Sequence, residues 1–283
     1  MCFENKKDTI LIRHKKSCII VLKGSDYVII NSFDDKSEAI INPKRKEHAI
    51  KVDACIITFS NIIEQYILDN YNCVKIAEYK FVTGITPIYE LEYNGHKFAF
   101  FRTYVGGPAC VGSIEDSFQE LNVNKYVLFG GAGCLNKEIT MGKVIIPTEA
   151  YRDEGTSYHY AKASDYIEIK NNSIVANFMK EYNIPYVLGK TWTTDAFYRE
   201  TKNNFEKHKA DGCISVEMEC ASVEAMCQFR NLNLYTFFIS GDLLDAPEWD
   251  ERKIPGEIKG TQHDGRYFDM ALKLADYITK NDL

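Results

Sequence analysis

The pattern of hydrophobic and polar residues changes near residue 52. From there, short runs of β-branched or aromatic residues alternate with longer stretches in which apolar residues recur at helical spacing. The strand-like runs cover residues 54–59, 98–103, 126–129, 143–147, 186–191 and 235–240. The helix-like stretches cover residues 62–71, 109–121, 173–182, 217–230 and 268–280. This alternation predicts an α/β domain with a mostly parallel or mixed, twisted central sheet that is flanked by helices.

Residues 1–42 follow a different pattern. Short apolar or alternating runs cover residues 9–13, 18–23 and 27–32, and the segments Lys15-Lys16 and Gly24-Ser25-Asp26 separate them. Such spacing is typical of β-hairpins. We therefore expect an N-terminal β-rich appendage over residues 1–42 and a single larger domain over residues 43–283.

Composition narrows the class of protein. The hydrophobic content of 45% and the charged content of 26% are those of a soluble globular chain. A formal net charge of −6 argues against nucleic acid or an anionic membrane as a partner. The first residues are polar, and no apolar run is long enough to span a membrane. We therefore expect a cytoplasmic protein.

The nine cysteines are scattered along the chain, and no Cys-x-x-Cys motif occurs. An odd number of scattered cysteines in a chain of 283 residues indicates reduced, mostly buried thiols. The close ligand spacing of structural zinc sites is absent, so we expect no metal.

Glycine-rich or acidic segments follow three of the predicted strands. They are Gly106-Gly107-Pro108, Gly130-Gly131-Ala132-Gly133 and Ser240-Gly241-Asp242. Each alone is ordinary turn chemistry, but ligands bind outside the carboxyl ends of such strands, so together they indicate a site. The run 130–133 also raises the alternative of dinucleotide binding. It lacks a third glycine at the required spacing and leads into a strand-like segment, which disfavours that alternative.

Carboxylates stand at two of these places. The segment Val216-Glu217-Met218-Glu219 puts two of them at the start of a predicted helix, and Asp242 ends a predicted strand. One ionised carboxylate can accept hydrogen bonds from two vicinal sugar hydroxyls, and it stabilises an oxocarbenium-like sugar. A second carboxyl can protonate a leaving base. The alternative is a pair of solvated acids stabilised by the helix dipole.

Together these motifs resemble the nucleoside phosphorylase superfamily of the uridine phosphorylase and trimeric purine nucleoside phosphorylase type. The matching segments are residues 106–108, 130–133, 139–147, 152–158, 194–198 and 216–219, within a similarity that runs from about Asp53 to the C-terminus. The resemblance implies a pentosyltransferase that cleaves the N-glycosidic bond of a nucleoside. It also implies inorganic phosphate as the co-substrate, no other cofactor, and a homodimer or a hexamer built as a trimer of dimers.

The resemblance also implies roles for single residues. Glu219 would accept hydrogen bonds from the ribose hydroxyls, with Glu217 nearby and Met218 under the sugar. His48 would be a contact to the 5′-hydroxyl supplied by a partner subunit. Asp242 would act as an acid toward the base, steadied by Arg252. The remaining base-binding residues would be Phe197, Tyr158, His159 and Thr201.

The base and the acceptor are less well determined. Pyrimidine-specific members carry Gln and Arg where Thr201 and Asn203 stand here, which together with Asp242 favours a purine-type base. The family's phosphate-binding arginines are missing: the loop 58–63 has none, and Leu128 replaces another.

A rebuilt phosphate site is one possibility, and it would consist of Arg102, Gly106, Gly107, Gly130 and Gly131. Family membership favours phosphate over water by only a little. A phosphate-independent nucleosidase is the first alternative. A non-catalytic nucleoside-binding or storage module is the second.

Overall fold

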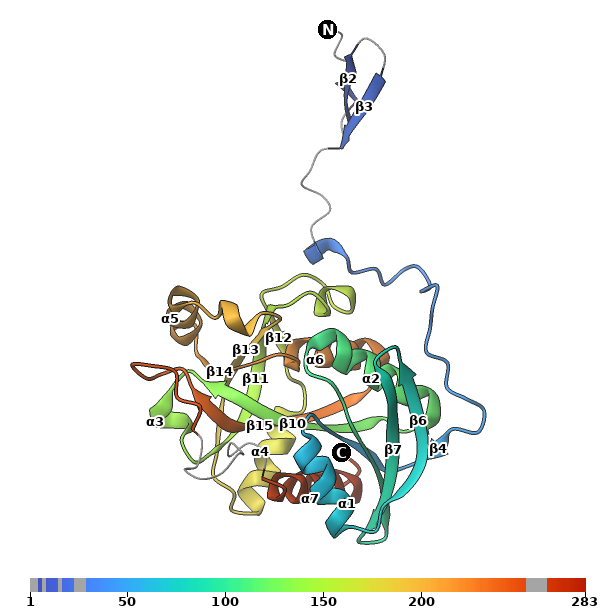
Figure 1. The fold of residues 1–283 in the computed structure, drawn as a ribbon, viewed down its shortest axis with the longest axis vertical. Coiled ribbons are helices and arrows are strands. Elements are labelled where there is room, and N and C mark those ends of the chain that lie inside the picture. The colour runs from blue at the N-terminus through green and yellow to red at the C-terminus, as the bar shows by residue number, and fades with distance from the viewer. Residues whose placement is uncertain (1–4, 7–8, 15–16, 23–28, 253–263) are drawn as a thin grey trace.

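The computed structural model describes residues 5–6, 9–14, 17–22, 29–252 and 264–283 (Figure 1). Its strands are β1 (Asn5–Lys6), β2 (Thr9–His14), β3 (Ser17–Leu22), β4 (Ile50–Lys51), β5 (Ala54–Thr58), β6 (Val74–Phe81), β7 (Gly84–Tyr93), β8 (His96–Arg102), β9 (Leu121–Asn122), β10 (Lys125–Cys134), β11 (Val144–Asp153), β12 (Tyr166–Glu168), β13 (Tyr186–Thr194), β14 (Cys213–Glu217) and β15 (Asn233–Leu243). The α-helices are α1 (Asn61–Asn70), α2 (Gly107–Glu120), α3 (Lys137–Thr140), α4 (Asn172–Glu181), α5 (Lys202–Ala210), α6 (Cys220–Arg230) and α7 (Arg266–Lys280). Short 3₁₀ turns are η1 (Ile29–Asn31), η2 (Ser157–His159) and η3 (Phe197–Arg199).

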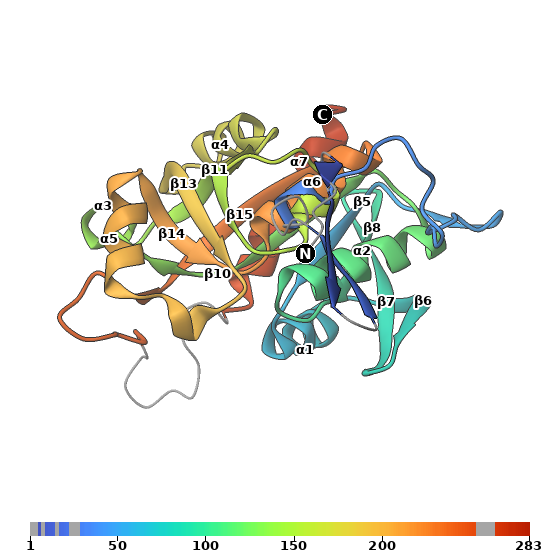
Figure 2. The same ribbon diagram turned by 90° about the horizontal axis from the view of Figure 1, so that it is seen from above.

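A ten-stranded mixed sheet forms the centre of the molecule. Its order is β12-β11-β13-β14-β10-β5-β8-β7-β6, and β15 pairs with both β10 and β11. The five strands β10, β14, β13, β11 and β15 therefore close into a ring, while β5, β8 and the β7–β6 hairpin extend the sheet on one side. Figure 2 shows this hairpin at one end of the molecule and α3 and α5 at the other. The α/β prediction with a mixed sheet is confirmed.

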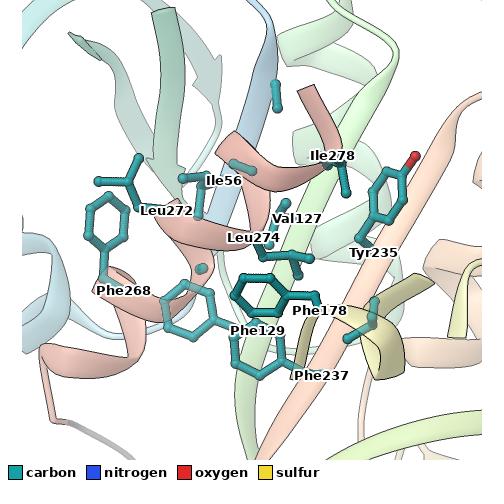
Figure 3. Close-up of a cluster of buried hydrophobic side chains, with 14 of the residues drawn as sticks. Ile56, Val127, Phe129, Phe178, Tyr235, Phe237, Phe268, Leu272, Leu274 and Ile278 are labelled. Atoms are coloured by element: carbon teal, nitrogen blue, oxygen red, sulfur yellow. The ribbon is translucent and has the colours of Figure 1, made fainter. Parts of the chain in front are cut away.

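Apolar side chains cover both faces of this sheet. Figure 3 shows Phe129 of β10 and Phe237 of β15 beside Phe178 of α4 and Phe268 of α7. The rings of Phe129 and Phe237 stack with their centroids 5.7 Å apart. The next residue back, Leu128, belongs to the cluster on the opposite face, which α2 and α6 cover. Alternate residues of β10 thus face different helical layers, which explains why its sequence is a continuous apolar run.

One element was not predicted, and two local predictions need correction. The hairpin β6–β7 was not expected, because polar residues such as Lys75 and Glu78 interrupt the apolar pattern of a half-exposed edge strand. The predicted helix 217–230 begins only at Cys220, because Glu217 is still part of β14. In the predicted strand 27–32, residues 29–31 form the turn η1, and residues 27–28 lie outside the described part.

The N-terminal segment forms a sheet of its own. Strands β1, β2 and β3 pair in antiparallel order, with Thr9 opposite Leu22 and His14 opposite Ser17. The hairpin between β2 and β3 therefore lies where the alternating pattern predicted one (Figure 1). The division of the chain at residue 42 stays a prediction.

The described residues also bear on redox chemistry, metals and membranes. Seven cysteines are free thiols, and all of these except Cys73 are buried; they are Cys55, Cys73, Cys110, Cys134, Cys213, Cys220 and Cys227. The described part of the chain holds no group of three or more His, Cys, Asp or Glu side chains arranged for a metal ion. In the same part, every helix is too short or too polar to cross a lipid bilayer.

Helices α2 and α6 approach closely at Gly107. A Cβ atom built on Gly107 would lie 2.3 Å from Oγ of Ser222, and Ser222 in turn donates a hydrogen bond to the buried Glu154. The first turn of α2 therefore rests directly on α6, and only glycine fits there.

We predict that Gly107→Ala destabilises the protein by about 2 kcal/mol, because the added methyl group overpacks the contact between the two helices. Urea denaturation of this variant, of Ser222→Gly and of the double variant gives the coupling between the two sites. The double variant should recover part of the loss, because it removes the atoms that clash. Strictly additive effects would contradict this packing argument.

Candidate active site

A cavity of about 1320 Å³ opens beside the second half of β10, where β14 and β15 end. The run 130–133 of β10 lies in the middle, because Gly133 is paired with Val216 of β14 and Ala132 with Ser240 of β15. Strands two places apart in a sheet are separated by about 10 Å. The acidic ends of β14 and β15 therefore face one cavity from either side of the glycine-rich segment, and Glu217, Glu219 and Asp242 all line it.

Glu217 fixes the turn between β14 and α6. Its side chain is buried, and Oε2 accepts hydrogen bonds from the backbone N–H groups of Glu219 at 2.7 Å and Cys220 at 2.6 Å. Oε1 accepts hydrogen bonds from the hydroxyls of Thr193 at 2.5 Å and Thr191 at 3.4 Å. Burial raises the pKa of Glu217 to about 7, although these hydrogen bonds act in the opposite direction. Both oxygens are thus occupied by the protein.

Glu219 is the carboxyl group that this turn presents to the cavity. It is the N-cap residue of α6 and only 8% exposed, and its Oε1 accepts a hydrogen bond from the backbone N–H of Gly106 at 2.6 Å. Burial, followed by the negative charge of Glu217, raises its pKa to about 8. Gly106 has φ of 103°, a conformation that favours glycine, and it caps α2. The N–H that was expected to bind phosphate therefore binds Glu219 instead.

Asp242 lines the same cavity from β15. Its Oδ2 accepts a hydrogen bond from the indole N–H of Trp249 at 2.7 Å. The guanidinium of Arg252 donates instead to Oγ of Ser240, also at 2.7 Å, and Arg252 is not among the residues that line the cavity. The expected partner of Asp242 is therefore corrected: Trp249 holds the carboxylate, while Arg252 is bound to a residue two positions earlier on the strand.

Glu200 also lines the cavity, although it was not among the predicted site residues. It directly follows η3, where Phe197 and Tyr198 line the cavity with ring centroids 4.1 Å apart. Burial, together with the negative charge of Asp242, raises the pKa of Glu200 to about 7. Its position three residues after the aromatic Phe197 could have suggested a place near the site. A single glutamate in a polar segment, however, does not show from sequence whether it is buried.

Several predicted base-binding residues do not reach the cavity in this chain. Tyr158 is buried, with its ring 4.1 Å from the Arg152 guanidinium and its hydroxyl donating to the Arg152 carbonyl. His159 is exposed and lines a second pocket of about 700 Å³ with residues of the segment 32–43. Thr201 caps α5, its hydroxyl accepting from the backbone N–H of Asn204. These positions bring no side chain to the base.

His48 lies in an exposed turn before β4, away from the cavity of its own chain. Its contact to the sugar of a neighbouring subunit stays a prediction.

The expected phosphate site is also not assembled. Arg102 Nε pairs with Glu64 Oε2 at 2.7 Å, and Arg102 does not line the cavity. A Cβ on Gly130 would lie 3.1 Å from the Phe59 ring, so the aromatic side chain occupies the space beside the glycine-rich segment. Next to Phe59 the cavity is lined by apolar residues, which are Ile62, Val105 and Leu128.

The charges around the cavity oppose an anionic ligand. Its described lining contains seven acidic residues, Glu200, Glu206, Glu217, Glu219, Asp242, Glu248 and Glu251, and a single basic one, Lys202. A phosphate dianion placed among them would be desolvated with only Lys202 of the described lining to pair with, and an incompletely paired buried dianion costs several kcal/mol. The cavity is suited to a neutral or cationic ligand.

A family model described as the phosphorylase superfamily matches residues 57–258. Because this match covers more than half of the chain, the protein belongs to the phosphorylase superfamily, as its motifs predicted.

Its relatives are distant. It is 25% identical over 190 residues to the purine nucleoside phosphorylase DeoD-type of Exiguobacterium sibiricum. This match covers 65% of this chain and 79% of that protein. It is 24% identical over 175 residues to the uridine phosphorylase of Escherichia coli, and this match covers 56% of this chain and 67% of that protein. It is 26% identical over 161 residues to an uncharacterized protein, R802, of Acanthamoeba polyphaga mimivirus. That match covers 56% of this chain and 63% of the viral protein, less than two thirds of its length.

We predict that Glu217→Ala destabilises the protein by about 3 kcal/mol, because it leaves two buried backbone N–H groups without an acceptor. Glu217→Gln should be tolerated, because the amide oxygen accepts from those groups and the amide nitrogen donates to the threonine hydroxyls. Guanidinium denaturation of both variants measures the difference.

The pH dependence of stability provides a second test of the role of Glu217. Burial raises the folded-state pKa of Glu217 to about 7, so its stabilising contribution is present below the unfolded value of 4.5 and is lost as pH rises through 7. Glu217→Gln should therefore gain stability relative to the wild type as pH rises through this window. An Ala variant as stable as the Gln variant at every pH would contradict the role assigned to Glu217.

Proposed function

We propose that this protein cleaves the N-glycosidic bond of a purine-type nucleoside and that water is the acceptor. The observation that carries the proposal is that Glu219 and Asp242, which are distant in sequence, line one cavity on either side of the glycine-rich segment of β10. A ligand between them is held at its sugar by Glu219 and meets Asp242 at its base.

Glu219 supplies the interaction that favours bond cleavage at the sugar. When the vicinal hydroxyls of a ribose donate to its carboxylate, they stabilise the ionised form against the burial that raises its pKa. The ionised carboxylate then lies close to the sugar carbon that becomes positively charged as the glycosidic bond lengthens. Met218, which lines the cavity beside it, provides an apolar surface for the sugar ring.

The other end of the cavity fits a nucleobase. Phe197 offers an aromatic face, and the carboxyl group of Asp242, held at one oxygen by Trp249, keeps its other oxygen for the base. A purine is a poor anionic leaving group, so hydrogen bonding or proton transfer to its ring nitrogen lowers the barrier, typically by about 10²–10⁴-fold in rate.

Water is favoured over phosphate as the acceptor, which reverses the narrow preference given by family membership. The reasons are the pairing of Arg102 with Glu64, the position of Phe59 beside Gly130 and the negative charge of the lining. Phosphorolysis remains the second candidate because two of the distant relatives carry the names purine nucleoside phosphorylase and uridine phosphorylase.

We predict that free base and free sugar are released from a purine nucleoside at the same rate with and without added phosphate, because the described lining offers the dianion no cation besides Lys202. The measurement is chromatography of a panel of purine and pyrimidine nucleosides after incubation in phosphate-free and phosphate-containing buffers. Formation of ribose 1-phosphate and a strict requirement for phosphate would establish phosphorolysis instead. Tight nucleoside binding without any product in either buffer would favour the non-catalytic binding module.

We predict that Asp242→Asn lowers kcat/KM for purine nucleosides by about 10²–10⁴-fold, because the amide cannot transfer a proton. Glu219→Gln should lower it by about 10²-fold, because a neutral amide does not stabilise a cationic sugar. Glu181→Gln, on the exposed end of α4, serves as a matched control and should behave as the wild type. Full activity of a folded Asp242→Asn variant would reject the role of this acid.

A further inference from the structure

The two oxygens of the Asp242 carboxyl group have different surroundings. The indole N–H of Trp249 donates to Oδ2 at 2.7 Å, and both residues line the cavity. Oδ1 lies beside the glycine-rich segment of β10, because a Cβ atom built on Gly133 would be 3.5 Å from it. Among the described residues, no side chain or backbone group donates a hydrogen bond to Oδ1. One oxygen is thus bound by the protein, and the other is available to a ligand.

The loop that carries the indole is anchored to its surroundings. It covers residues 243–250, and it is closed by two backbone hydrogen bonds, of 2.8 and 3.2 Å, between Leu243 and Asp250. Inside the loop, Asp245 accepts from Nζ of Lys209 on α5 at 2.8 Å and from the first backbone N–H of α3 at 3.1 Å. These contacts fix the position of the indole relative to β15.

Arg252 anchors the same loop from its C-terminal side. Its backbone N–H donates to Oδ1 of Asp250 at 2.8 Å, and its guanidinium donates to Oγ of Ser240 at 2.7 Å. Ser240 is buried on β15, two residues before Asp242. Arg252 therefore ties the end of the loop to the strand that carries the acid.

We propose that Trp249 is a positioning residue, whose indole keeps the acidic proton of Asp242 on Oδ1 and so directs it to N7 of the purine. This inference rests on the proposed function, because it assumes that Asp242 donates a proton to the base.

The effect follows from the hydrogen-bonding chemistry of the two groups. An indole N–H is a donor only, whereas a protonated carboxyl group has one oxygen that donates and one that accepts. The oxygen that faces Trp249 is therefore the carbonyl oxygen, and the proton lies on Oδ1 beside the glycine-rich segment. N7 of a purine is a hydrogen-bond acceptor, so it matches a donating Oδ1. Without the indole, either oxygen can carry the proton.

The same hydrogen bond strengthens during the reaction. As the C1′–N9 bond breaks, its electron pair passes to the base, N7 takes the proton from Oδ1, and the base leaves as a neutral molecule. Water supplies the new oxygen on C1′, and the proton that this water loses replaces the one given up by Asp242. In the meantime Asp242 is a carboxylate, and a hydrogen bond to an ionised acceptor is about twice as strong as a neutral one. Trp249 therefore stabilises the transition state more than the bound substrate.

The test is steady-state cleavage of a purine nucleoside by Trp249→Phe, which keeps an aromatic ring and removes the N–H. The side chain is 64% exposed, so the full-length variant should fold, which circular dichroism verifies. The value of kcat should fall about 10-fold, which corresponds to the difference between a charged and a neutral hydrogen bond. KM should stay within about 2-fold, because the bond gains its strength only in the transition state.

A double-mutant cycle shows whether the indole acts through the acid. Adding Trp249→Phe to Asp242→Asn should lower kcat by less than about 2-fold, because no acidic proton is left to position. As a matched control, Tyr182→Phe also removes a polar group from an aromatic side chain. Tyr182 is exposed at the end of α4, outside the cavity, so this variant should match the wild type.

A nucleoside methylated at N7 gives a second readout that separates positioning from structural support. Its base is already positively charged and leaves as a neutral molecule without a proton from the protein. Trp249→Phe should therefore cleave it within about 2-fold of the wild-type rate. An indole that only supported the loop would be required equally for both nucleosides.

An unchanged kcat in a folded Trp249→Phe variant, an additive loss in the double variant, or an equal loss on the methylated nucleoside would overturn the inference. Failure of the proposed function is distinguishable, because the wild type and Asp242→Asn are measured in the same assay. If the wild type cleaves purine nucleosides and Asp242→Asn does not, such results reject only the role of Trp249. A wild type that cleaves none of them rejects both proposals.

Discussion

The buried carboxylate of Glu217 is the interaction on which the rest of the site depends. It accepts hydrogen bonds from the first backbone N–H groups of the turn into α6 and from two threonine hydroxyls of β13. A buried acid in this position is costly unless it is fully hydrogen-bonded. Because Glu217 is held in this way, the turn places Glu219 in the cavity, where Gly106 at the start of α2 holds one of its oxygens.

The charge of the cavity has consequences for its chemistry. Burial raises the pKa values of Glu219 and Glu200, and the neighbouring charges of Glu217 and Asp242, respectively, add to this effect. Such groups exchange protons near neutral pH, which suits proton transfer and hydrogen bonding to a neutral ligand. The same charge repels a phosphate dianion. The pairing of Arg102 with Glu64 and the excess of carboxyl groups in the described lining thus act in the same direction on the electrostatics of the site.

The fold and the two principal carboxylates could be predicted because they depend on local patterns. Residues 54–59 and 126–129 are continuous apolar runs typical of buried strands, and Glu219 and Asp242 stand where two further predicted elements begin or end, so both reach the cavity. What could not be predicted depends on register and on distant partners. The sequence around Arg102 does not indicate that it pairs with Glu64. The sequence around Tyr158 likewise does not indicate that the Arg152 guanidinium lies over its ring. Glu200 becomes notable only once the fold brings it to Asp242.

The most direct measurement is a crystal structure of the Asp242→Asn variant soaked with adenosine. The account predicts one nucleoside in the cavity, with both ribose hydroxyls within hydrogen-bond distance of the Glu219 carboxylate and the edge of the base facing residue 242. An adenosine bound elsewhere, or one whose sugar and base both lie on the same side of the glycine-rich segment of β10, would contradict it.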